Sequence, residues 1–533
     1  MHLIRRLAKK VILILSPSIR RLIADRDAAL ADRADRDAAL ADRDAALADR
    51  DAALADRDAA LADRDTALAD RDTARALSSQ ALSERDALRA QVQSPLSFEA
   101  STEPATFSYL PPVLVRSGES LQQPPLDLFQ KPFFDPLNVD ISPDLAAHPR
   151  LNILLPSTSV AHNSGGPNSM YLLAAEMVKR EIPLRFIAVS MPADSDNGLI
   201  RDHIAAISGV SRELVNKIEF IDASDRCHPI SLGENDLFFA TAWWTAQMLK
   251  YLLPRFNCQC FAYLIQDFEP NLHTSSVNSA MALETYGMDY MPVVNSQLLY
   301  DHFVQKGVGR FADPNFAGNR CWFEPAVDRK LYYPQAHPAD MKRRLLFYAR
   351  PNVPRNLIEF GLAALMFLVN DGTLQHEHWD FFSSVIGVGG GCRPICLSDD
   401  GKSVLAPLSL YDLKDWASEM RRTDVVLSLI WSPHTSYPPL EGAASGCMVA
   451  TNTCGVKTVK RLQEISSNIV AGPPTIEGVS ESLREAVLRS YDWEARVAGA
   501  QLGSPKTWTD SFHPILPQLF EFLRSNGISA LRD

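Results

Sequence analysis

Arginine and carboxylate side chains follow two short apolar runs, where they are suited to phosphate and proton chemistry. Arg350 and Arg355 come after the run at residues 345–349, in a loop bounded by prolines. Two guanidinium groups in such a loop can clamp a diphosphate through paired hydrogen bonds. Asp267 follows the run at residues 261–265 and is a candidate for orienting or deprotonating an acceptor hydroxyl. Solvated loop arginines and a structural or helix-capping carboxylate are the alternative interpretation.

Residues 423–455 predict a strand, a polar loop, a short helix and a second strand. The apolar runs at residues 425–430 and 447–450 are the predicted strands, and Pro438 and Pro439 precede Glu441 in the predicted helix. Proline fits the first helical turn, and the helix N-terminus attracts an anion above the sheet. An ordinary βαβ unit without a ligand is the alternative. The loop supplies three candidates for contact with a sugar or a phosphate: His434, Ser436 and Tyr437.

A third candidate segment opens the globular part. A buried strand is predicted at residues 151–155, and an apolar-periodic helix at residues 170–180. Between them lie Gly165 and Gly166, for which we expect a glycine-rich turn that lets a ligand approach the backbone. A plain turn without a ligand is the alternative.

The elements that position these residues alternate between strands and helices. Strands are predicted in two groups: 151–155, 184–189, 236–240, 260–265 and 291–294, then 344–349, 379–386, 404–408, 424–430 and 447–451. Such alternation is typical of parallel sheets covered by helices on both faces. We therefore predict an α/β protein with Rossmann-like domains at residues 149–335 and 336–507, followed by an apolar-periodic C-terminal helix at 508–533.

Taken together, residues 150–510 resemble family-4-type glycosyltransferases of the two-Rossmann-domain (GT-B) architecture. The family's Gly-Arg and Glu-Lys pairs correspond to Ala349-Arg350 and Pro354-Arg355, with the same spacing. Its second glutamate and the following Ala-x-Gly helix correspond to the segment from Glu441 to residue 451. Its hinge strand, Gly-Val-Asp-x-x-x-Phe-x-Pro, resembles residues 325–334.

The resemblance implies a role for each candidate. Arg350 and Arg355 would stabilise the leaving diphosphate without a metal ion, because fixed cations act where charge develops. Gly165 and Gly166 would face the donor phosphates, Glu441 would hold the ribose hydroxyls, and the C-terminal helix would cross back over the first domain. Transfer would retain the anomeric configuration. Glu269 is a second candidate for the role of Asp267, and the loop pair Asp194 and Asp196 is interpreted as solvated rather than metal-binding.

One departure from the family narrows the expected donor. Where the family has its first glutamate, which contacts the donor sugar, this chain has Pro433 followed by His434. The segments 432–441 and 266–270 look like the bacterial rhamnosyltransferase branch, which uses dTDP-rhamnose to build O-antigen or S-layer glycans. We therefore expect L-rhamnose transfer to a polysaccharide or a lipid-linked glycan. A non-catalytic glycan-binding scaffold and a nucleotide-sugar epimerase of the same fold are the alternatives.

Length and composition agree with this interpretation. The 533 residues fit two domains plus appended segments, and the net charge of −11 argues against nucleic-acid binding. The 8 cysteines form no Cys-x-x-Cys pair, which favours reduced thiols in a cytoplasmic protein without a zinc site. No apolar run reaches the ~20 residues that span a bilayer.

The N-terminal third has a different character. Residues 1–23 are basic and amphipathic, which favours peripheral contact with an anionic membrane on its cytoplasmic face; docking on protein is the alternative. Residues 24–92 predict a long helix with the heptad Asp-Ala-Ala-Leu-Ala-Asp-Arg, which could form a homo-oligomeric coiled coil or serve as a spacer. Residues 93–148 are proline-rich and predict an irregular linker.

Overall fold

A computed structural model describes residues 21, 136–160, 165–194, 196–273, 275–318, 320–338, 341–350, 353–384, 394–408 and 413–528. The chain divides into two compact units, residues 1–120 and 121–533. The basic head, the heptads and most of the linker lie outside the described residues, apart from Arg21, so their predicted roles stay predictions. None of the described helices combines the length and the apolar character needed to cross a membrane.

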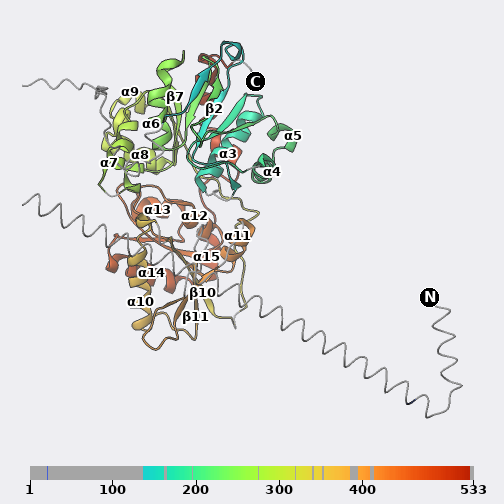
Figure 1. The fold of residues 1–533 in the computed structure, drawn as a ribbon. Coiled ribbons are helices and arrows are strands. Elements are labelled where there is room, and N and C mark those ends of the chain that lie inside the picture. The colour runs from blue at the N-terminus through green and yellow to red at the C-terminus, as the bar shows by residue number, and fades with distance from the viewer. Residues whose placement is uncertain are drawn as a thin grey trace, which may run out of the picture. The chain divides into compact units, whose positions relative to one another are not determined.

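The first domain contains a seven-stranded parallel sheet (Figure 1). The strand order is β4-β3-β2-β6-β7-β8-β9, so the chain winds outward from β2 in one direction and then from β6 in the other. This reversal makes a topological switch point between β2 and β6, and ligands of open α/β sheets bind at the carboxyl ends of the strands there. The strands are β2 (Leu151–Leu155), β3 (Leu184–Ala188), β4 (Glu219–Asp222), β6 (Leu237–Ala240), β7 (Phe261–Ile265), β8 (Tyr290–Asn295) and β9 (Trp322–Phe323).

Alternate residues of these strands enter two separate cores, because successive side chains point to opposite faces. Ile153 packs with α3, whereas Leu154 packs with α6 and α8 on the other face. A short parallel pair, β1 (Val139–Ile141) with β5 (Ile230–Leu232), borders this domain. The helices are α3 (Gly165–Val178), α4 (Asn197–Ser208), α5 (Arg212–Val215), α6 (Trp243–Leu252), α7 (Val277–Thr285), α8 (Gln297–Lys306) and α9 (Pro314–Ala317), with short 3₁₀ turns that include η6 (Glu269–Leu272).

The second domain repeats this plan with the order β12-β13-β11-β10-β14-β15-β16. All pairs are parallel except β12 with β13. Its switch point lies between β10 and β14. The strands are β10 (Arg343–Tyr348), β11 (Trp379–Ser384), β12 (Ile395–Cys396), β13 (Val404–Leu408), β14 (Val425–Leu427), β15 (Met448–Asn452) and β16 (Ile469–Gly472). The helices are η8 (Pro354–Asn356), α10 (Ile358–Asn370), α11 (Leu413–Arg421), α12 (Tyr437–Ala444), α13 (Val459–Ile465), α14 (Ile476–Arg489) and α15 (Trp493–Gly499).

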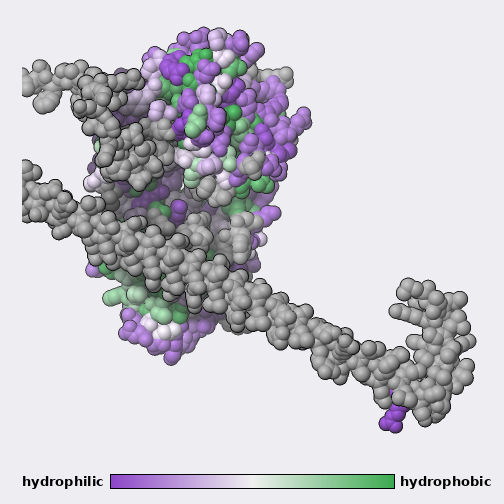
Figure 2. Space-filling model, in the orientation of Figure 1, coloured by the Kyte–Doolittle hydropathy of each residue, from purple (hydrophilic) through white to green (hydrophobic). Residues whose placement is uncertain are grey.

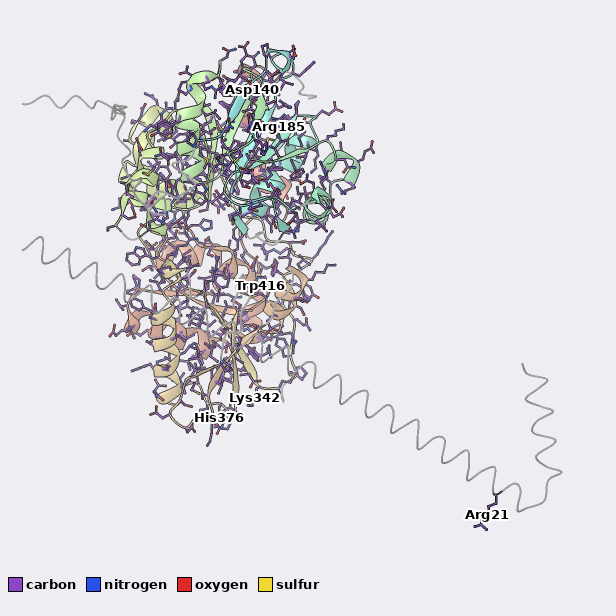
Figure 3. All side chains as sticks on the ribbon, in the orientation of Figure 1. Arg21, Asp140, Arg185, Lys342, His376 and Trp416 are labelled. Carbon is purple, nitrogen blue, oxygen red and sulfur yellow. The ribbon has the colours of Figure 1, made fainter. Side chains whose placement is uncertain are left out.

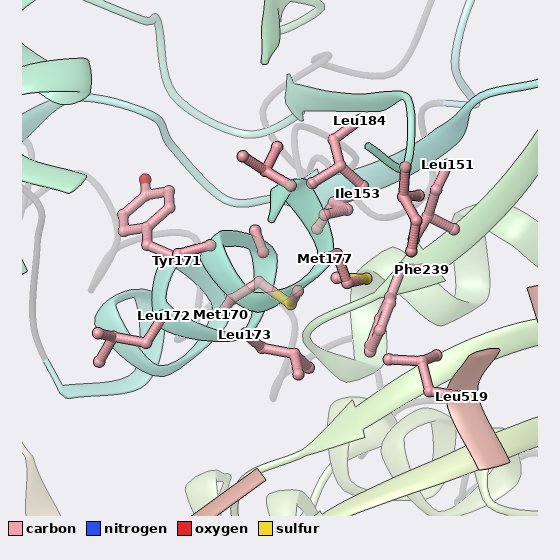
Figure 4. Packing of buried hydrophobic residues seen from close by; sticks show 14 of the residues in the cluster. Leu151, Ile153, Met170, Tyr171, Leu172, Leu173, Met177, Leu184, Phe239 and Leu519 are labelled. Carbon is pink, nitrogen blue, oxygen red and sulfur yellow. The ribbon is translucent and has the colours of Figure 1, made fainter. Parts of the chain in front are cut away.

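The end of the described chain returns to the first domain. Two helices, α16 (Trp508–Phe512) and α17 (Leu516–Ser525), replace the single helix expected at 508–533. Phe512 and Leu519 are fully buried in the core that also holds Leu151, Ile153 and Met170 (Figure 4). Burying apolar surface in this way ties the C-terminus to the first sheet.

The predicted α/β class and both Rossmann-like domains are confirmed. Each strand that the apolar runs predicted is present, and residues 385 and 386 of the strand expected at 379–386 lie outside the described residues. The strand expected at residues 424–430 is shorter, β14, because both backbone groups of Ile430 bond to the Asn452 side chain instead of to the sheet. The surface of the second domain includes an apolar area around α10, where Met366 and Phe367 are exposed (Figure 2).

Candidate functional site

Loops from the two sheets meet at the carboxyl ends of their strands. In the second domain, β10 leads through Arg350 into η8, and β14 leads into the loop at residues 430–436. In the first domain, β7 leads into Asp267 and η6. The side chains of these three loops are in contact, so the two domains form one candidate site.

Asp267 is the centre of this contact. Its Oδ2 atom accepts a hydrogen bond from Arg355 Nη1 at 2.6 Å, and its Oδ1 atom accepts from the N–H of Phe268 at 2.8 Å and from the Ser432 hydroxyl. Asp267 is buried, and the Nε of Arg355 is buried without a partner among the described residues. The predicted proton acceptor and the predicted diphosphate ligand are therefore an ion pair in this structure.

Glu269 does not share this position. Glu269 is the first residue of η6, and its buried carboxylate accepts a hydrogen bond from the Tyr263 hydroxyl at 2.9 Å. Burial raises the pKa of Glu269 to about 8, with hydrogen bonds from Tyr263 and from the backbone of Trp243 opposing this rise. A neutral, internally bonded acid is a structural group, so Asp267 is the better placed of the two candidates.

Arg350 is half-buried just past the end of β10. Within the described part of the chain, no carboxylate forms an ion pair with it. Burial raises the pKa of the nearby Tyr348 hydroxyl, and the charge of Arg350 opposes that rise. Arg350 therefore offers a positive charge that no described carboxylate neutralises.

The loop at residues 430–436 is folded around His434. The Ser432 hydroxyl accepts a hydrogen bond from the N–H of His434 at 3.0 Å, and His434 Nδ1 accepts one from the N–H of Ser436 at 2.9 Å. Ser436 has φ 67° and ψ 164°, a conformation that costs a non-glycine residue about 1–3 kcal/mol. Such strain is typical of functional sites, where the surrounding contacts must hold it in place.

No sequence pattern pointed to Lys457, which lies beside this loop. Its side chain is completely buried, and its Nζ donates to the carbonyls of Ile430 at 3.2 Å and His434 at 3.5 Å. Burial lowers the pKa of Lys457 to about 8. Burial also lowers the pKa of His434 to about 4, and the charges of Lys457 and Arg355 add to that effect while Asp267 opposes it. His434 is therefore neutral at pH 7.

The N-terminus of α12 differs from the anion site that was expected. Prolines occupy positions 438 and 439, as predicted, but they remove two N–H groups from the first turn. Tyr437 extends from this turn into the first domain, where its hydroxyl bonds to Ser169 at 2.6 Å and to Asn295 at 3.1 Å. To contact the sugar nucleotide through this hydroxyl, Tyr437 would have to release Ser169 or Asn295.

The glycine pair has a different setting from the one predicted. The expected turn is wrong for Gly165 and Gly166, which are the first residues of α3. A Cβ atom on Gly165 would lie 2.9 Å from the ring of Tyr437, and one on Gly166 would lie 3.3 Å from the Gln266 amide. Close approach by neighbouring protein groups explains why glycine is suited to these positions; contact with donor phosphates stays a prediction.

Glu441 lies one turn into α12, between the second sheet and α11. It accepts a hydrogen bond from Trp416 Nε1 at 2.7 Å, and Trp416 is labelled in Figure 3. Burial raises the pKa of Glu441, while Trp416 and the nearby Tyr332 hydroxyl lower it. Its predicted contact with ribose hydroxyls therefore involves a carboxylate that protein donors already orient.

Asp194 and Asp196 serve local structure. Asp194 accepts a hydrogen bond from the N–H of Val160, and Asp196 caps the N-terminus of α4. In the described ranges, no three His, Cys, Asp or Glu side chains lie close enough together to hold a metal ion. Metal-independent transfer remains a prediction.

Known protein families match both domains. Residues 150–297 match the N-terminal domain of WsaF, and residues 343–484 match its C-terminal domain, which together make up more than half of the chain. The O-antigen biosynthesis protein RfbC of Myxococcus xanthus is 33% identical over 252 residues. This match covers 47% of the chain but only 18% of the relative's own length.

Solved structures are similar at low sequence identity. The sucrose-phosphate synthase of Thermosynechococcus elongatus has a TM-score of 0.47 at 13% identity, covering 70% of this chain and 98% of its own. HepE of Anabaena, in complex with UDP-glucose, has a TM-score of 0.45 at 12% identity and covers 71% and 100%. From the two domain matches and the paired Rossmann-like sheets, we conclude that the chain is a GT-B glycosyltransferase of the WsaF family.

Proposed function

We propose that this enzyme transfers L-rhamnose from dTDP-rhamnose to a growing cell-surface polysaccharide or a lipid-linked glycan. The name of the Myxococcus relative, an O-antigen biosynthesis protein, supports this class of acceptor. The rhamnosyl donor is supported by the loop at residues 430–436. Where hexose enzymes have a carboxylate, this loop has Pro433 and a neutral His434. Rhamnose is a 6-deoxy sugar, and a site with one carboxylate fewer suits it chemically.

The observation that carries the proposal is the ion pair of Asp267 and Arg355 between the two domains. In the proposed reaction, the bond between the sugar C1 and the diphosphate oxygen breaks while the acceptor oxygen bonds to C1. Arg355 and Arg350 bind the departing diphosphate, whose growing negative charge they stabilise. Asp267 takes the proton of the acceptor hydroxyl. When the substrates bind, Arg355 therefore exchanges Asp267 for the diphosphate, and Asp267 exchanges Arg355 for the acceptor hydroxyl.

Thermal stabilisation of the full chain by a panel of nucleotide sugars tests the donor. We expect the unfolding temperature to rise selectively with dTDP-rhamnose, because a ligand that binds only the folded state stabilises it. An Arg350→Ala, Glu441→Ala double variant should lose this shift. The matched control, Arg212→Ala with Glu213→Ala on α5, changes the same charges outside the site and should keep it.

Other outcomes decide between the alternatives. A selective shift with UDP-glucose or GDP-mannose would reject the rhamnosyl donor and leave the transferase intact. No shift with any donor would favour the glycan-binding scaffold. Conversion of a donor to its epimer in the absence of acceptor would favour an epimerase.

A further inference from the structure

Two buried polar groups near the candidate site have bonding capacity that the protein does not use. His434 is only 5% exposed, and its Nε2 has no hydrogen-bond partner among the described residues. Because Nδ1 accepts from the N–H of Ser436, the neutral ring carries its proton on Nε2. A buried donor without a partner costs about 1–3 kcal/mol, so its retention indicates a ligand.

Lys457 has an equally unusual position. It is a completely buried cation, and no described carboxylate forms an ion pair with it. Among the residues that the structure describes, its Nζ bonds only to two carbonyls, those of Ile430 and His434. Such a group is costly to bury, and a neutral side chain would satisfy one carbonyl at lower cost.

The two carbonyl contacts of Lys457 are not equivalent. Ile430 is also held by Asn452, which bonds to both its N–H and its carbonyl at 2.8 and 3.0 Å. The His434 carbonyl has Lys457 as its partner. The distinct contribution of Lys457 is therefore at the His434 end of the loop, next to the strained Ser436.

We propose that Lys457 is a positioning residue for donor binding, because it holds the His434 backbone so that Nε2–H is presented to the sugar nucleotide. This inference rests on the proposed transferase function. The charged groups that act on the His434 ring are Asp267 after β7, Arg355 on η8 and Lys457 after β15. The ring of Tyr437 also lies beside it, with the two ring centroids 6.2 Å apart. Burial lowers the pKa of His434, and the charges of Lys457 and Arg355 add to that effect, so the His434 ring stays an uncharged donor.

A double-mutant cycle in the full chain tests this role. His434→Asn keeps an acceptor for the N–H of Ser436 but lacks the distal donor, and Lys457→Met removes the cation at nearly the same length. We expect each to weaken dTDP-rhamnose binding about tenfold, measured by calorimetry. The double variant should bind dTDP-rhamnose as tightly as His434→Asn alone, because both changes act through the same contact with the sugar nucleotide.

A second measurement requires no ligand. In ¹³C-histidine-labelled protein, the His434 signal is identified by its absence from His434→Asn. Its pKa should rise in Lys457→Met and also in Lys457→Gln, which keeps an amide donor without the charge. Lys457→Gln should bind the nucleotide better than Lys457→Met, because it retains part of the tie to the carbonyl.

A merely structural lysine would give different results. Asn152→Ala is the control, since it removes a buried side chain that bonds to the Leu237 carbonyl in the first domain. Three results together would show that the inference is wrong. Lys457→Met would lower the unfolding temperature as Asn152→Ala does, its effect on binding would add to that of His434→Asn, and the pKa of His434 would not change. If the wild type binds UDP-glucose instead of dTDP-rhamnose, the rhamnosyl proposal fails, and the same cycle with UDP-glucose still tests Lys457. A wild type that binds no nucleotide sugar overturns both.

Discussion

Two of the contacts between the domains are built from opposite kinds of chemistry. At one, Arg355 and Asp267 form an ion pair; at the other, the neutral Tyr437 hydroxyl bonds to Ser169 and Asn295. An ion pair can be exchanged for an anionic diphosphate and a hydroxyl acceptor. A neutral contact gains nothing from an anion and is suited to staying in place while substrates come and go.

Backbone strain lies beside the neutral contact on both sides. Ser436, next to Tyr437, has φ 67°, and Ser296, next to Asn295, has φ 86°. Both are non-glycine residues in the left-handed region, which the surrounding structure must over-determine. The proposed reaction uses the ionic contact and leaves the neutral contact in place.

The largest effect is expected for Asp267→Asn. Loss of the proton acceptor should lower kcat by about 10²–10⁴-fold. The same change releases Arg355 from its partner, so the dissociation constant of dTDP should fall severalfold. Steady-state kinetics and calorimetry measure the two quantities. A variant with both kcat and affinity close to wild type would show that the ion pair is only structural.

Arg355→Met should reduce kcat by about 10²-fold, because one fixed charge that stabilises the leaving group is lost. The control is Arg461→Met, which breaks another Arg–Asp pair between the domains: Arg461 with Asp301 at 2.5 Å. Equal losses in both variants would mean that docking of the domains, rather than diphosphate binding, explains the effect.

Tyr437→Phe should have a smaller effect on transfer, less than about tenfold. The change removes the hydroxyl that bonds to Ser169 and Asn295 in the first domain. The free energy of unfolding should therefore fall by about 1–2 kcal/mol. Denaturant unfolding measures this. Tyr251→Phe is the matched control, because Tyr251 is 65% exposed and should give no change. A large loss of donor affinity in Tyr437→Phe would instead support its predicted direct contact with the donor.

Glu269→Gln should change transfer least, by less than about twofold. Its main effect should be on how the free energy of unfolding depends on pH. The folded-state pKa of Glu269 is raised from 4.5 to about 8, so the folded chain binds a proton more tightly than the unfolded chain. The stabilising contribution of Glu269 to the folded state is therefore fully present below pH 4.5 and is lost as pH rises to about 8.

Unfolding curves at several pH values test this expectation. Glu269→Gln should gain about 1 kcal/mol or more over the wild type between pH 5 and 8. An equal difference at every pH would show that folding does not raise the pKa of Glu269.

The central strands could be predicted because they are continuous apolar runs that a parallel sheet buries on both faces. The strands that were missed are short or lie at edges. β4 has the sequence EFID with both ends exposed, and β9 has two residues, so neither shows a hydrophobic pattern. The helix start at Gly165 was also missed, since adjacent glycines normally mark turns.

For the site, the sequence by itself determined that Asp267, Arg350 and Arg355 follow buried strands, because continuous apolar runs predict such strands and ligands of open α/β sheets bind at their carboxyl ends. Glu441 was found instead through the resemblance to the family's second glutamate. Only the tertiary structure decided how these groups meet. It separated Asp267 from Glu269 by burial and directed Tyr437 to the first domain. It also placed Lys457 under His434. These outcomes depend on contacts between residues up to 268 positions apart in the chain, and local sequence patterns carry no information on such contacts.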